Sequence, residues 1–88
     1  MTETRDLTLD GNAIGGLLLE LFGTELTAAP CVCDSCGASE EMARLTVYVH
    51  CPGVVVRCPH CSEVVLVVVR GRDRTWVDLR GTRRLVLG

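Results

Sequence analysis

The 88-residue sequence predicts a single α+β domain, residues 1–88, in which an antiparallel β-sheet carries one N-terminal helix packed on it. Three observations predict this fold: apolar residues at helical spacing near the N-terminus, alternating apolar runs further on, and two short cysteine motifs. A chain of this length buries only about 60% of the surface that it exposes when unfolded, so its core alone is marginal. Such domains commonly need a metal, disulfides or a partner chain.

A helix is expected over residues 11–22. Asp10 is a good N-cap, because its carboxylate can accept hydrogen bonds from the free N–H groups of the first turn. The apolar residues that follow fall on one half of a helical wheel, namely Ala13, Ile14, Leu17, Leu18, Leu21 and Phe22. Gly23 can take the left-handed conformation that ends a helix.

The rest of the chain carries strand patterns separated by turns. The segment over 63–70 is apolar on both faces, so we expect it to lie centrally in the sheet with cover on each side. A short strand over 24–28 is a further expectation, and residues 51–54 have the composition of a turn. The main strands are expected at 44–50, 54–57, 63–70, 75–80 and 83–87.

Two Cys-x2-Cys motifs, at 33–36 and 58–61, are separated by 21 residues. A two-residue gap in a tight turn lets both sulfur atoms of a motif converge on one ion. Two facing turns, or knuckles, supply a tetrahedral shell of four sulfurs, which suits one structural Zn2+. The sequence therefore predicts a zinc-ribbon-like fold with Cys33, Cys36, Cys58 and Cys61 as metal ligands.

The remaining cysteines and histidines are weaker ligand candidates. Cys31 alternates with Cys33, so both side chains point the same way on an extended segment, and a ligand swap between them stays open. Cys51 is expected to be a free thiol at a hairpin tip. His50 is a potential ligand by chemistry alone, and His60 lies inside a knuckle, where a side chain normally points away from the ion.

The order of these motifs resembles a family of short bacterial proteins that share a domain of unknown function. The resemblance covers nearly the whole chain. It implies a zinc-ribbon-like fold and no established activity, and the family is associated with gene neighbourhoods that contain redox enzymes. It rests on residues 9–12, the motif Cys33-x2-Cys36-Gly37, residues 47–53, the motif Arg57-Cys58-Pro59-x-Cys61 and residues 76–81.

The expected function is a non-catalytic structural-zinc module, acting through an unknown protein partner or as an accessory subunit, with a redox-related partner one option. No enzyme-like constellation is apparent, and four-sulfur zinc leaves no open coordination position for chemistry. The first alternative is a rubredoxin-like electron carrier with one iron, although Ser62 stands where that pattern expects glycine.

The second alternative is nucleic-acid binding through the arginine-rich end of the chain, in which Trp76 could stack on a base. Residues 57–88 hold seven arginines against three acids, whereas residues 1–56 hold two against eight. The overall charge of −2 and the shortage of aromatic residues make nucleic acid an unlikely partner. The polar N-terminus and the absence of a long apolar run favour a cytoplasmic protein without a membrane segment.

Overall fold

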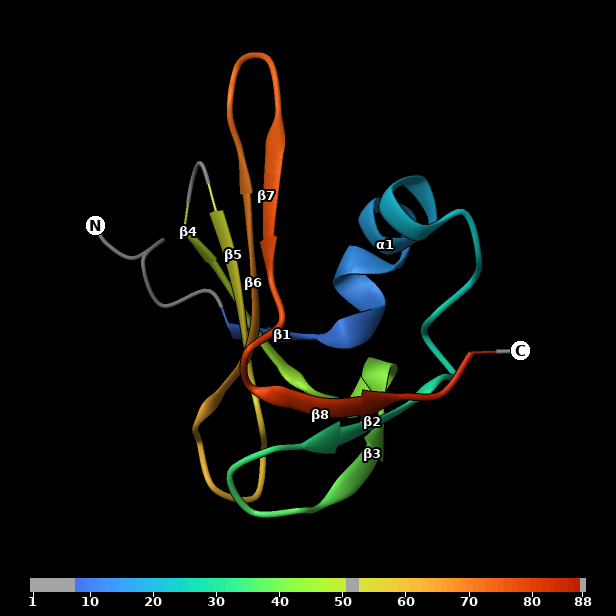
Figure 1. Ribbon diagram of the computed structural model, residues 1–88, viewed down its shortest axis with the longest axis vertical. Helices are drawn as coiled ribbons and strands as arrows, with labels where there is room; N and C mark the ends of the chain where they lie inside the picture. The colour runs from blue at the N-terminus through green and yellow to red at the C-terminus, as the bar shows by residue number, and fades with distance from the viewer. Residues whose placement is uncertain (1–7, 51–52, 88) are drawn as a thin grey trace.

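The computed structural model describes residues 8–50 and 53–87 of the chain (Figure 1). In these ranges the chain forms one α-helix, strands of three to seven residues, and two 3-10 turns. The 3-10 turns are at Gly11–Ile14 and Met42–Arg44. The helix is α1 (Gly15–Phe22). The strands are β1 (Thr8–Asp10), β2 (Pro30–Cys33), β3 (Ser39–Glu41), β4 (Thr46–His50), β5 (Gly53–Arg57), β6 (Val64–Arg70), β7 (Thr75–Asp78) and β8 (Thr82–Leu85).

The predicted helix over 11–22 is present, but its first turn is 3-10 and only Gly15–Phe22 is α-helical. The Asp10 carboxylate caps this segment by accepting a hydrogen bond from the N–H of Asn12 at 3.1 Å. Gly23 ends α1 with a φ of 73°, as expected of a C-terminal glycine. None of the helical segments in the described parts of the chain has the length and apolar character needed to cross a membrane.

A five-stranded antiparallel sheet has the order β1-β4-β5-β6-β7, and α1 packs on one of its faces (Figure 1). Residues directly opposite each other on neighbouring strands share a face of the sheet. On the face toward α1, Val47, Val56 and Val68 are fully buried together with Leu18 of the helix. A salt bridge of 3.2 Å between Arg70 and Glu20 joins the end of β6 to the helix.

A second, three-stranded sheet has the order β3-β2-β8 (Figure 1). The expectation that 83–87 completes one common sheet is therefore wrong. The chain reverses at Gly81, where an added Cβ would lie 1.9 Å from the carbonyl oxygen of Val64, so only glycine permits this close approach. The Thr82 hydroxyl donates to the carbonyl of Val65 at 2.9 Å, and β8 then pairs with β2 instead of β7.

Several strand limits also differ from the expected ones. The strand expected over 44–50 begins at Thr46, because residues 42–44 form a 3-10 turn. Strand β7 ends at Asp78, two residues early, and residues 24–28 form no strand. Strand β6 is the fourth of five strands, paired on both edges but not central. The turn expected at 51–54 falls partly on residues 51–52, outside the described residues.

Candidate metal centre

Each Cys-x2-Cys motif occupies the turn between two antiparallel strands. The first knuckle follows the end of β2 at Cys33 and leads into β3, and the second follows β5 and leads into β6. The two hairpins belong to different sheets, and their turns come together at one end of the molecule (Figure 1). The cysteine cluster therefore joins the two sheets at this end, together with a contact of 2.7 Å between His60 in the second knuckle and Glu40 in β3.

The two knuckles have the same backbone hydrogen bonds. In each, the N–H four residues after the first cysteine donates to that cysteine's carbonyl, at 2.9 Å in the first knuckle and 2.8 Å in the second. The N–H of the first cysteine itself donates to the carbonyl five residues further on, at 2.9 Å in both. The bonds are Gly37 N–H to Cys33, Ser62 N–H to Cys58, Cys33 N–H to Ala38 and Cys58 N–H to Glu63.

Closing such a turn requires a left-handed residue directly after its second cysteine. Gly37 has a φ of 79° and Ser62 a φ of 69°, so the serine takes the conformation that glycine takes in the other knuckle. Among the described residues, Ser62 is the only non-glycine with a positive φ. A side chain in this region costs roughly 1–2 kcal/mol, so the second knuckle stores strain that the first avoids.

The four sulfur atoms are close enough to hold one metal ion. The Sγ atoms of Cys33, Cys36, Cys58 and Cys61 all lie within 4.8 Å of one another. Two of the distances, Cys33 to Cys61 and Cys36 to Cys58, are 3.7 Å. Four ligands at about 2.3 Å around a tetrahedral ion are about 3.8 Å apart, whereas bonded sulfurs are about 2.05 Å apart. The cluster has the dimensions of a sulfur tetrahedron, and its four cysteines are free thiols.

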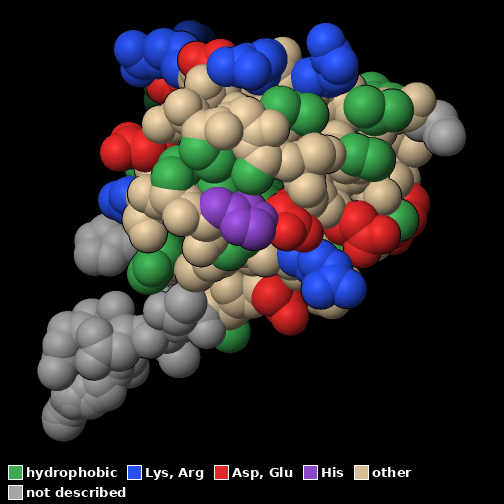
Figure 2. Space-filling model, turned by 90° about the horizontal axis from the view of Figure 1, so that it is seen from below, with side chains coloured by type: hydrophobic (Ala, Val, Ile, Leu, Met, Phe, Trp, Pro, Cys, Tyr) green, Lys and Arg blue, Asp and Glu red, His purple; other side chains and the backbone are tan. Residues whose placement is uncertain are grey.

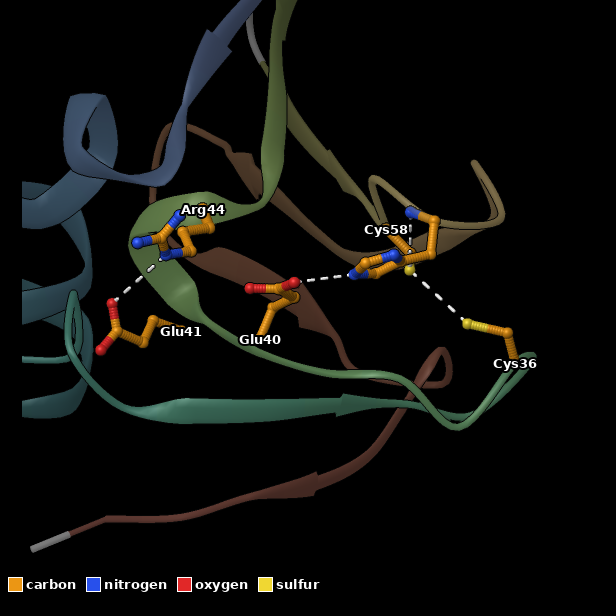
Figure 3. Close-up of polar contacts among 6 residues, drawn as sticks. Cys36, Glu40, Glu41, Arg44 and Cys58 are labelled. Atoms are coloured by element: carbon orange, nitrogen blue, oxygen red, sulfur yellow. Dashed lines mark hydrogen bonds and ion pairs between the residues drawn. The ribbon is translucent and has the colours of Figure 1, made fainter.

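The sulfurs differ in their exposure. Cys33 and Cys58 are both 2% exposed, Cys61 is half-buried and Cys36 is exposed. Figure 3 shows the Cys36 and Cys58 side chains pointing toward each other from their two knuckles. The N–H of His60 also donates to the Cys58 sulfur at 3.4 Å. One side of the cluster is therefore sealed by protein, and the other meets solvent.

The environment of the first knuckle separates the acidities of its two thiols. Burial tends to raise the pKa of Cys33, but hydrogen bonds from the backbone N–H groups of Cys36 and Ser35 outweigh it and lower the pKa to about 7. A backbone hydrogen bond from Ala38 favours the Cys36 thiolate, yet burial and the neighbouring thiols together raise its pKa to about 11. Gathering several thiolates in one place needs a cation to offset their mutual repulsion.

Two of the weaker ligand candidates lie outside the cluster. Cys31 is 1% exposed and shares the inner side of β2 with Cys33, as the alternation predicts, but its sulfur lies 4.0 Å from the Thr82 hydroxyl and belongs to no metal-sized group among the described residues. The His60 imidazole points to the Glu40 carboxylate at 2.7 Å, which Figure 3 shows reaching across from β3. Cys51 and the side chain of His50 lie outside the described residues.

Arginines support both knuckles, which the sequence analysis did not anticipate. Arg57 donates to the carbonyl of Ser62 at 2.7 Å. Arg83, from β8, donates to the carbonyl of Asp34 at 3.0 Å and to its carboxylate at 3.3 Å. Arg57 is adjacent to its knuckle in sequence, but Arg83 is 49 positions from Asp34, so no local pattern could reveal that contact. Figure 2 views the molecule from the knuckle end, where arginine side chains line one margin of the face.

No curated protein and no solved structure matches this chain in the comparisons. A family model does match, over residues 2–87, which is nearly the full length of the sequence. The resemblance stated from the motifs is thereby confirmed at the level of the family. With its helix on antiparallel sheets and its cluster of four cysteines, the chain belongs to a family of unknown function, DUF6510.

Proposed function

We propose that the chain is a non-catalytic structural-zinc module, in which Cys33, Cys36, Cys58 and Cys61 hold one Zn2+, and that it acts as a protein-interaction or accessory subunit. The observation that carries this proposal is the sulfur cluster, whose 3.7 Å separations suit a tetrahedral ion. Such a shell has four protein ligands and no open position for substrate, which favours a structural role over a catalytic one.

We expect the metal to stabilise the fold. The two sheets share no ladder of hydrogen bonds with each other in the described residues, and the knuckles meet only through their sulfurs and side chains. Structural zinc contributes about 10–16 kcal/mol in small peptides, as much as the whole stability of a typical domain. We therefore expect the metal-free chain to lose cooperative folding.

Elemental analysis of the purified chain tests this proposal. We expect one zinc per chain, and we expect complete removal by a chelator to abolish the cooperative melt followed by circular dichroism. The matched variants are Cys33→Ser, which should lose zinc, and Cys31→Ser, which should retain it because Cys31 lies outside the cluster. A metal-free chain with an unchanged melt, or equal zinc in both variants, would contradict the proposal.

A rubredoxin-like iron centre is the second candidate. One iron fits the same four-sulfur tetrahedron, so ligand geometry does not separate the two metals. The exposure of Cys36 favours this candidate, because an electron carrier needs a ligand near the surface. Iron(III) in this shell would make the purified protein red, whereas the zinc form is colourless, so an absorption spectrum together with the elemental analysis decides between them.

We propose a protein as the partner, with a redox enzyme as one option, in preference to nucleic acid. Three arginines of the basic segment are paired with carboxylates: Arg70 with Glu20, Arg80 with Asp78 and Arg83 with Asp34. These pairs reduce the positive charge available for phosphates. A binding assay with labelled oligonucleotides is expected to show no salt-dependent affinity, and salt-dependent binding would favour the nucleic-acid alternative.

A further inference from the structure

The face of the five-stranded sheet that points away from α1 carries a row of apolar side chains. Strand pairing places Tyr48 opposite Val55, and Val55 opposite Val67, on this side. The next row holds Val69 opposite Trp76. We call these five residues the outer sheet face, since their neighbours Val47, Val56 and Val68 point to the opposite side, where α1 covers them.

In the described residues no helix packs on the outer sheet face, although Val49 and Val77 at the far end of the inner face are also exposed, at 37% and 38%. Trp76 is 55% exposed and Tyr48 is 38% exposed, and the three valines between them are only partly buried. The double-sided apolar pattern of β6 predicted cover on each side; Val65 and Leu66 are both 1% exposed, whereas Val67 and Val69 on the outer side are only half-buried. A contiguous apolar surface of this kind marks an interaction site more often than an ordinary exposed surface does.

The composition of the face and of the remaining chain narrows the choice of partner. Of residues 1–7, only Met1 and Leu7 are apolar, so this segment is poorly suited to cover three valines and two aromatic rings. The face itself has polar groups at its margins that complement one another. Tyr48 offers a hydroxyl on β4, and Asp78 presents a carboxylate on β7, in the same row and at opposite ends.

From this arrangement we infer that the outer sheet face binds a second copy of the chain through a two-fold axis that runs parallel to the strands, between β5 and β6. This inference names a partner for the interaction role proposed above. The axis places β5 of one copy over β6 of the other and β4 over β7. Val55 then meets Val67 of the second copy, and the bulk of Val69 meets Gly53. Sheets stacked in this way lie about 10 Å apart.

The same axis matches charges at the knuckle end of the face. Arg57 pairs with Val64 across the strands, so the axis places Arg57 of each copy over Val64 of the other. Val64 lines a cleft of about 640 Å3 whose walls include the carboxylates of Asp34, Glu63 and Asp78 and the guanidinium of Arg80, which pairs with Asp78 at 2.8 Å. The Arg57 guanidinium therefore faces a cleft on the second copy that keeps an excess of carboxylate charge after the Arg80–Asp78 and Arg83–Asp34 pairs are counted, and the Tyr48 hydroxyl faces Asp78. A two-fold axis repeats each of these contacts twice.

The dimer is expected to be weak and reversible. Four strands about 4.8 Å apart and five residues of about 3.3 Å each give a flat footprint of roughly 300 Å2 per copy. Side chains roughen this flat area and increase it, so the two copies together bury about 1,000 Å2 of accessible surface. This is at the low end for specific interfaces. We expect a dissociation constant on the order of 1–100 μM.

Sedimentation of the full-length, metal-loaded chain over a concentration series tests the inference. The expected result is a reversible shift from 9.5 kDa to twice that mass. A chain that stays at 9.5 kDa up to about 500 μM, well above the expected dissociation constant, overturns the inference whatever the variants show. Zinc analysis of the same sample separates the two proposals. A zinc-loaded monomer would refute the dimer but not the zinc module, and a metal-free dimer would refute the zinc module but not the dimer.

Charge variants test the pairing of strands across the axis. Val55→Arg and Val67→Glu each bury an unpaired charge at the interface, so each should weaken the dimer roughly 100-fold. An equal mixture of the two variants should restore association, because the arginine introduced at position 55 of one copy then faces the glutamate introduced at position 67 of the other. Failure of the mixture to associate, with both variants folded by circular dichroism, overturns this pairing.

The matched control for these variants is Leu19→Arg. Leu19 is 47% exposed on α1, on the other side of the sheet, so the same charge there should leave the dimer unchanged. A dimer that Leu19→Arg disrupts and Val55→Arg leaves intact would place the interface on the helix, which overturns the inference.

Discussion

The residue directly after the second cysteine is serine in one knuckle and glycine in the other. Exchanging the two residue types should therefore change the stability of the fold in opposite directions. Ser62 has a φ of 69° in the place where Gly37 has a φ of 79°. Left-handed backbone costs a residue with a side chain roughly 1–2 kcal/mol, and glycine gives back about 0.5–1 kcal/mol through the greater freedom of its unfolded chain. Ser62→Gly should therefore stabilise the zinc-loaded chain by about 0.5–1 kcal/mol, and Gly37→Ser should destabilise it by a similar amount.

Space around the two residues does not decide the sign. A Cβ added at Gly37 would find its nearest atom, a guanidinium nitrogen of Arg83, at an ordinary 3.8 Å, so the expected loss comes from the backbone and not from a clash. Thermal unfolding at a fixed excess of zinc is the assay, with a shift of about 2–8 °C in each direction for a domain of this size. A lower Tm for Ser62→Gly would refute the argument from backbone strain.

Three further predictions concern other sites. Gly81→Ala should lower the free energy of unfolding by about 3 kcal/mol in a denaturant titration, because its Cβ would lie 1.9 Å from a β6 carbonyl oxygen. Gly16→Ala has open space around it and should stabilise the helix by about 0.5–1 kcal/mol. Equal effects of the two substitutions would contradict this prediction. Hydrogen bonds from Arg80 lower the pKa of Asp78 to about 2, so its contribution to stability is present above pH 3.8 and is lost as the pH falls through 2; a carboxyl titration by NMR with a midpoint near the ordinary aspartate value would exclude this. Cys31→Val should keep the metal content and the fold, since Cys31 is a buried apolar neighbour of the cluster, and loss of metal in elemental analysis would reassign it as a ligand.

The helix and the main strands were predictable because their signals are local. Asp10 and Gly23 sit at the two ends of the helical segment, and alternation along β4 and β5 identifies the side that meets the core. The short strands β2 and β3 were not predicted because segments of four and three residues are too short to give a repeating pattern. The placement of β8 depends on a close approach between Gly81 and Val64, which are far apart along the chain.

The candidate site also combines features that local sequence predicts with features that depend on distant contacts. Two Cys-x2-Cys motifs identified the four cysteines that the structure brings within 4.8 Å of one another, because each motif forms its own tight turn regardless of the rest of the chain. Only the folded structure shows that Cys31 lies outside the cluster, because Cys31 and Cys33 are both cysteines on the same side of β2. The sequence did not indicate that Arg83 and Glu40 would support the knuckles.

By itself, the sequence determined those features that depend on residues near one another along the chain: the helix with its caps, the main strands and the two thiol turns. Only the tertiary structure decided how the second sheet crosses the first, which arginine supports which knuckle, and that Val67 and Val69 on the outer side of β6 stay half-exposed in the described residues. These features depend on contacts between residues 17 to 50 positions apart. Such contacts form only when the whole chain packs, and no local pattern records which of the possible partners will meet.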